Sequence, residues 1–125
     1  MNYYFVIQGK LHSMNDIIRI ARNNRYGSAN AKKQQMDIVS SGVYSFGLHN
    51  VKIEKKIDVE ISFYEPNSRR DPDNIVSGMK FIFDALVNMG VIKDDSQKYI
   101  GKILLSEIMV DKENPRIEVR LIERD

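Results

Sequence analysis

The sequence predicts an α/β fold of the α+β two-layer type, with a mixed β-sheet of about four strands and two or three helices. Apolar residues alternate with polar ones over residues 51–63, which is typical of a strand packed on one face. Over residues 75–86 the apolar spacing is four, three and four, which predicts a buried helix face. Because 125 residues are too few for two ordinary cores, we expect one domain over residues 1–125.

The elements are expected in the order β, α, β, α, β, β. An aromatic and β-branched run at residues 3–7 predicts the first strand. An apolar cluster over residues 15–21, with Asn and Asp near its start, predicts the first helix. Residues 23–28 are expected to break this helix. A weaker helical pattern resumes over residues 29–39, with Gly42 as its expected stop.

The middle of the chain combines a strand and a loop. The alternation over residues 51–63 predicts the second strand, with a turn or bulge at Lys55 and Lys56. Residues 65–73 hold two prolines and show no periodicity, so they are expected to form a loop that leaves this strand.

The last third predicts one helix and two strands. The apolar stripe gives a helix that runs to about Met89 and stops at Gly90. Residues 99–110 and 117–122 are rich in apolar and β-branched residues and predict two strands. The polar residues 111–115 between them indicate a hairpin connection.

The composition excludes several classes of protein. An apolar fraction of 42%, with 19 basic and 17 acidic residues, is typical of a globular chain. The absence of cysteine excludes disulfides, thiolate metal sites and cysteine nucleophiles. With only His12 and His49, a metal is expected on carboxylate oxygens, which favours Mg²⁺ or Mn²⁺. No apolar run approaches the roughly 18 residues of a membrane span, so we expect no membrane contact and a cytoplasmic location. We also expect no organic cofactor.

Basic residues gather in one segment although the net charge is only +2. Between Asp16 and Asp37 the chain carries no acidic residue, and such a segment is typical of a helix face that binds the nucleic-acid backbone. An ordinary solvated helix is the alternative. The five basic residues are Arg19, Arg22, Arg25, Lys32 and Lys33.

Two aspartates are paired by local geometry. Asp71 precedes a proline, which favours an extended backbone, and residues two apart in an extended segment point to the same side. Asp71 and Asp73 should therefore present both carboxylates together. Asp73 also stands where the helix begins, so a capping role is the alternative, but capping explains one aspartate and not both.

Further charged residues follow on the helix and after it. Lys80 and Asp84 lie almost two and about three turns after Asp73, so they share its helix face. An exposed ion pair between them is the alternative role. Asp94 and Asp95 return toward the first pair if the next strand completes a βαβ unit; the alternative is a solvated turn. Converging carboxylates need a divalent cation, and such a centre with a nearby lysine suits phosphodiester hydrolysis.

The segment 69–97 resembles the RusA family of Holliday-junction resolvases and related phage endonucleases. The matching features keep a specific order and spacing. They are Arg69 and Arg70, the Asp71-x-Asp73-Asn74 motif, Lys80, Asp84-Ala85-Leu86, Gly90, and Asp94-Asp95-Ser96-Gln97.

The resemblance implies a RusA-like fold and a Mg²⁺-dependent homodimer, with Mn²⁺ as an alternative metal, that binds four-way DNA junctions and nicks two strands symmetrically. It implies catalytic and metal-binding roles for Asp71, Asp73 and Asp95, with Asp94 as a neighbouring metal-binding acid. Lys80 matches the family's functional lysine when counted back from Asp84. Counted from Asp73, the family interval falls on Ser77 instead.

The DNA-binding residues are expected in two regions. Arg69 and Arg70 precede the acidic motif. The amino-terminal part departs from the family pattern, and the residues expected to serve there are Asn15, Arg22, Arg25, Lys32 and Lys33.

Three functions remain open at this point: a RusA-type endonuclease, a junction-binding or other nucleic-acid-binding protein with little or no cleavage, and a structural or protein-interaction domain whose aspartates are only caps and turns. The apolar residues left for a dimer surface equally suit an ordinary core. They are Val43, Tyr44, Phe46 and Leu48.

Overall fold

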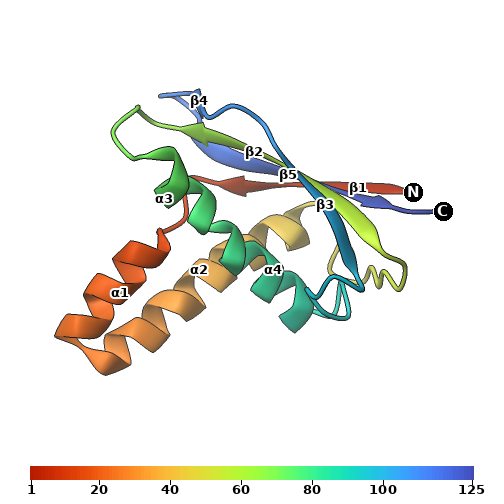
Figure 1. The fold of residues 1–125 in the computed structure, drawn as a ribbon, viewed down its shortest axis with the longest axis horizontal. Helices are drawn as coiled ribbons and strands as arrows, with labels where there is room; N and C mark the ends of the chain where they lie inside the picture. Colours follow the sequence, from red (N-terminus) through yellow and green to blue (C-terminus); the bar gives the residue numbers. More distant parts are fainter.

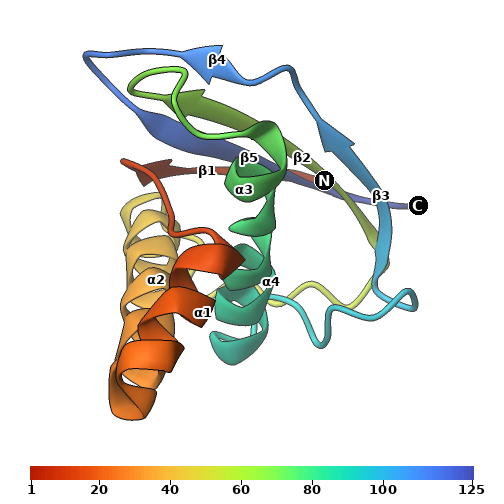
Figure 2. The same cartoon turned by 60° about the vertical axis from the view of Figure 1, so that its left-hand side comes forward.

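The computed structural model describes the backbone of residues 1–125 and every side chain except that of Arg25. The helices cover one face of a mixed sheet, so the predicted α+β two-layer class is confirmed (Figures 1 and 2). Among the described residues, no helix has both the length and the apolar character that a membrane crossing requires. The elements are β1 (Asn2–Gln8), α1 (Met14–Asn23), α2 (Arg25–Ser45), β2 (Ile57–Glu65), α3 (Pro72–Ser77), α4 (Met79–Asn88), β3 (Ile100–Leu105), β4 (Met109–Val110) and β5 (Arg116–Glu123).

The sheet has the order β1-β5-β2-β3, and β4 pairs with the far end of β2. β5 is antiparallel to both of its neighbours, whereas β3 is parallel to β2. The predicted hairpin between the last two strands is wrong, because β2 separates β5 from β3 and β4. The central position suits β5, since its alternate residues Ile117, Val119 and Leu121 are fully buried.

The predicted second strand begins later than expected. β2 starts at Ile57, and its residues Val59, Ile61 and Phe63 alternate into the core. Ile53 is also buried, but it forms only an isolated bridge with Ile92, and its N–H donates to the carbonyl of Val91. The apolar positions before residue 57 therefore reflect packing of a segment that lies outside the five-stranded sheet.

The break between α1 and α2 is a single residue and not the predicted stretch 23–28. Asn24 has an extended backbone, and its side-chain oxygen accepts hydrogen bonds from the N–H groups of Tyr26 and Gly27. This cap lets α2 begin at once. α1 begins with a capping box in which the side chains of Ser13 and Asp16 each accept from the other's backbone N–H.

The expected stop at Gly42 is wrong, because α2 continues to Ser45. A Cβ atom at Gly42 would overlap the carbonyl oxygen of Val6, so glycine is needed for the close approach of α2 to β1. Of the apolar residues that follow, Val43 is buried and Leu48 packs against the core. Tyr44 and Phe46 are exposed, and their rings contact His49 and Tyr4.

The helix predicted over residues 75–89 consists of two segments, α3 and α4, joined at Gly78. Gly78 keeps right-handed backbone angles, with φ −64° and ψ −15°. A Cβ there would lie 3.2 Å from Cβ of Leu11, so this glycine lets the chain after β1 cross the helix closely. The predicted stop at Gly90 is confirmed by its φ of +76°.

We expect Gly42→Ala to lower the free energy of unfolding by about 1–3 kcal/mol, because the added methyl group meets the backbone of β1. Urea denaturation measures this change. Gly27→Ala on the same helix is the control. Its Cβ meets only the Asn24 side chain, so stability should be unchanged or raised by up to about 1 kcal/mol. Equal losses in both variants would contradict the close-approach explanation.

Candidate active site

The first two aspartates lie at the start of α3. Asp71 is extended, with φ −70° and ψ 147°, and Pro72 begins the helix. Asp71 occupies the N-cap position, yet its side chain makes no capping hydrogen bond. Both Asp71 and Asp73 are exposed, and neither forms a hydrogen bond or an ion pair with a described side chain. Two exposed carboxylates without a partner among the described side chains therefore lie at the start of α3.

The start of α1 lies against this acidic motif. The amide nitrogen Nδ2 of Asn15 donates to Oδ1 of Asn74 over 2.8 Å. The Ser77 hydroxyl accepts from the N–H of Met14 and donates to the carbonyl of Asn74. Asn15, which was predicted to bind DNA, thus lies beside the Asp71-x-Asp73-Asn74 motif. Ser77, at the family interval for the lysine, joins α1 to α3.

The two arginines before the motif lie in different environments. The guanidinium of Arg70 donates to both carboxylate oxygens of Glu65, over 2.9 and 2.8 Å, and to the carbonyl of Leu11. Glu65 is buried, with 2% of its surface exposed. Arg69 is exposed, and its side chain has no partner among the described residues. Of the two, Arg69 is free to meet a phosphate and Arg70 is held by the fold.

Lys80 lies between two carboxylates farther along the helix. Its Nζ is 3.0 Å from Oδ1 of Asp84 and 3.7 Å from Oδ2 of Asp95. Asp84, as hydrogen-bond acceptor and as opposite charge, raises the pKa of Lys80 above its usual value, and Asp95 adds to this effect. Together with Met36, Val87 and Asn88, these side chains line a surface hollow of about 340 Å³.

Asp84 was missing from the predicted site. Its sequence signal was the four-residue spacing from Lys80, which also suits an ordinary ion pair on a helix surface. The contact between Lys80 and Asp95 shows that more than an ordinary helix-surface ion pair is present. Because this contact depends on the tertiary fold, the sequence spacing did not reveal it. Asp94, the neighbour of Asp95, is exposed and has no partner among the described side chains.

The two acidic groups lie toward opposite ends of β2. The chain forms the expected βαβ unit, with β3 parallel to β2. α3 and α4 therefore run back along β2, a strand roughly 30 Å long. Asp71 follows the end of β2, whereas Asp95 precedes β3, where Ile100 pairs with Ile57 at the start of β2. The expected return of Asp95 to the Asp71 end is not met within one chain.

The predicted metal ligands fit Mg²⁺ in chemistry but not in placement. Carboxylate oxygens are the donors that Mg²⁺ prefers. Among the described side chains, however, no three Asp, Glu or His groups gather closely enough to hold a metal ion. Asp95 faces Lys80, and Asp71 and Asp73 lie at the other end of the helical crossover. One chain in this arrangement does not supply the three-carboxylate centre.

The basic segment forms a helical hairpin that extends away from the sheet (Figure 1). Arg22, Lys32 and Lys33 are exposed and form no ion pair with a described side chain. Arg19 pairs with Asp16 over 2.6 Å. The side chain of Arg25 lies outside the described part of the structure.

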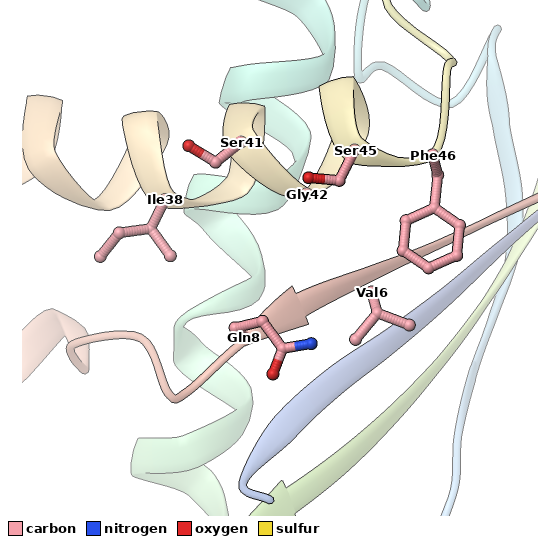
Figure 3. A pocket seen from close by; sticks show the side chains of 7 residues that line it. All are labelled: Val6, Gln8, Ile38, Ser41, Gly42, Ser45 and Phe46. Carbon is pink, nitrogen blue, oxygen red and sulfur yellow. The ribbon is translucent and has the colours of Figure 1, made fainter.

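An apolar hollow of about 240 Å³ lies between β1 and α2 (Figure 3). Gly42 forms part of its wall, and Gln8 is the largest polar side chain there. None of its lining residues is charged. This hollow carries none of the groups that phosphodiester chemistry requires.

A family model described as endodeoxyribonuclease RusA matches residues 3–122. The chain belongs to this family. The resemblance found in residues 69–97 is thereby confirmed, and it extends over nearly the whole chain. No curated protein matches the sequence. Membership in the RusA family supports a nuclease that cuts DNA internally, in the class that resolves Holliday junctions.

We expect Arg70→Ala to lower the free energy of unfolding by about 3–5 kcal/mol, because it leaves the buried Glu65 carboxylate without its partner. Arg69→Ala removes the same charge from an exposed neighbour and should change stability by less than about 0.5 kcal/mol. Chemical denaturation of both variants checks the contrast. Similar values for the two would show that the Glu65–Arg70 pair does not hold the loop.

Proposed function

We propose that this RusA-family protein is a Mg²⁺-dependent endonuclease that acts on four-way DNA junctions as a homodimer and makes paired nicks. The family match over residues 3–122 carries the proposal. The pair of exposed, unpartnered carboxylates at Asp71 and Asp73 supports it, because such groups are accessible to a cation and to a DNA phosphate. We further propose that residues 1–125 act as one endonuclease domain in the cytoplasm.

The roles proposed for the site follow its two groups of residues. Asp71 and Asp73 hold the metal ion, and Asn15 lies beside them through Asn74. Asp95 supplies the third carboxylate and Asp94 a neighbouring one. Lys80 stabilises negative charge on the phosphate. When bound, Mg²⁺ polarises the phosphoryl group and lowers the pKa of an attacking water.

A second copy of the chain can bring an Asp95 close to the Asp71 and Asp73 of the first copy. In a two-fold dimer, the surface near Asp95 of one copy can meet the surface near Asp73 of the other, which gives two equivalent sites. The sheet edge supports self-association, since its large apolar side chains are between 39% and 57% exposed. They are Ile103, Leu104, Leu105, Met109 and Val110.

DNA contact is proposed along the basic helical hairpin and at Arg69. The hairpin carries Arg22, Lys32 and Lys33 on its exposed surface, and Arg25 belongs to the same segment. Unpaired cations of this kind bind phosphates with little dependence on base sequence. Because Arg70 is held by Glu65, its contribution to DNA binding is indirect, through the position of the loop that carries Arg69.

A junction-binding protein with little cleavage is the alternative function. Two observations favour it: Ser77 stands at the family interval for the lysine, and no three carboxylates gather among the described side chains of one chain. The two functions share DNA binding and differ in catalysis. A cleavage assay therefore separates them.

We expect Asp73→Asn to reduce nicking of a synthetic four-way junction by more than about 100-fold, because even the outer partners of a metal site contribute 10–100-fold. Junction affinity should be retained. Nicking with Mg²⁺ or Mn²⁺ and gel-shift binding measure the two effects. Asp37→Asn, an exposed aspartate of α2 without a described partner, is the charge control. Binding by the native chain without any nicking would favour the alternative function.

Mixing two inactive variants tests whether the site is shared between copies. Asp73→Asn and Asp95→Asn chains, unfolded and refolded together, form mixed dimers in about half of the population. Each mixed dimer should hold one intact shared site, so single nicks return without paired cuts. Each variant alone should stay inactive. If every mixture is as inactive as its components, the three aspartates act within one chain.

A further inference from the structure

The Lys80 ammonium is shared by carboxylates from two segments of the chain. Asp84 belongs to α4, as Lys80 does, whereas Asp95 lies in the loop before β3. The Nζ–oxygen distances are 3.0 Å to Asp84 and 3.7 Å to Asp95, so the lysine lies closer to its helix neighbour. The shorter contact to Asp84 thus holds the ammonium at a place that is still within ion-pair distance of Asp95.

Helix stabilisation alone is a weak explanation for this pair. In a helix, an acid that precedes a base by four residues is the more stabilising order. Here the lysine precedes the aspartate, which is the less favourable order. Surface pairs of this kind contribute little to stability. The main consequence of the Lys80–Asp84 contact is therefore where it places the lysine relative to Asp95.

Asp84 is the fixed member of the pair. Its chain neighbours Phe83 and Ala85 are buried, which holds the backbone of α4 in place. Lys80 has a flexible four-carbon stem, and 56% of its side chain is exposed. Asp84 has no other hydrogen bond or ion pair among the described side chains. Without Asp84, the lysine would keep only the longer contact to a loop residue.

We propose that Asp84 is a positioning residue: it holds the Lys80 ammonium beside Asp95, so that lysine and aspartate reach the scissile phosphate as one unit. The proposal rests on the proposed nuclease function. The proposal explains how Lys80, one helical turn beyond the family interval, serves the site. The lysine is positioned relative to Asp95, beyond the end of α4, and not relative to Asp73 at the start of α3. Asp84 itself needs no contact with DNA.

Asp84→Ala tests the proposal in the full-length protein, with Asp37→Ala on α2 as the matched control. Alanine favours helix at both positions, so both variants should keep the native unfolding temperature. We expect Asp84→Ala to lower the single-turnover nicking rate by about 10- to 100-fold, the effect of a misplaced catalytic group, with junction affinity unchanged. Asp84→Glu should restore part of the rate.

Lys80→Met supplies a double-mutant cycle. If Asp84 acts through the lysine, Asp84→Ala causes no further loss of rate in the Lys80→Met background. Equal losses in the native and Lys80→Met backgrounds would overturn the proposal. A fall in junction affinity in place of the nicking rate would also overturn it, because that result assigns Asp84 to binding or folding.

A measurement without catalysis separates this proposal from the nuclease function. Carbon-13 relaxation of the Lys80 Cε methylene reports the order of the lysine side chain. Its mobility should rise in Asp84→Ala and stay unchanged in Asp37→Ala. Unchanged mobility in Asp84→Ala refutes the positioning role whether or not the protein cuts DNA. Absence of nicking by the native protein refutes the proposed function, and the relaxation result still decides the role of Asp84.

Discussion

The helical crossover from β2 to β3 determines where every acidic side chain of the RusA motif lies. Because β3 is parallel to β2, the chain must return to the start of β2 before β3 can begin. α3 and α4 make this return, so residues at the two ends of the crossover are held apart (Figure 2). Asp71 and Asp73 lie at one end and Asp95 beyond the other. A single chain therefore presents two separate groups of acidic side chains.

The end that carries Asp71 and Asp73 is held by polar contacts with the segment after β1. Arg70 joins the buried Glu65 to the carbonyl of Leu11. Ser77 accepts from the N–H of Met14, and Asn15 donates to Asn74. Buried charges are stable only when they are paired, so the Glu65–Arg70 pair constrains the loop before α3. The exposed carboxylates of Asp71 and Asp73 are thus carried by a segment that is tied to the chain after β1.

Local patterns in the sequence predicted which segments form helices and strands better than they predicted which elements lie side by side. The apolar stripe from Ile75 to Leu86 correctly predicted the helical segment between β2 and β3, because the spacing of apolar residues is enough to identify a buried helix face. The hairpin before β5 was wrong, since pairing depends on which strand fills the centre of the sheet. Gly42 was mistaken for a helix stop because a glycine needed for close packing has the same sequence signal as a glycine that ends a helix.

The same limit applies to the acidic residues. The extended backbone expected at Asp71 before proline is present, but Asp73 already belongs to α3, so the predicted pairing of their carboxylates stays a prediction. The βαβ unit was expected and is present, but in such a unit the chain after the helix returns to the start of β2, whereas Asp71 follows the end of β2, so Asp95 does not reach Asp71 within one chain. Asp84 was placed on the helix face of Asp73 but given no site role, because its four-residue spacing from Lys80 is common on helix surfaces. The tertiary contact of Lys80 with Asp95 sets this pair apart from an ordinary ion pair on a helix surface.

The choice between Ser77 and Lys80 follows from what each side chain already contacts. Ser77 is engaged by Met14 and Asn74, so its hydroxyl serves the joint between α1 and α3. Lys80 is one turn farther and exposed, and it faces Asp95 across the hollow on α4. A lysine in this position lies beside Asp95 and not beside Asp73. If the acidic site is completed between two copies, each copy contributes Asp71 and Asp73 to one site and Lys80 with Asp95 to the other.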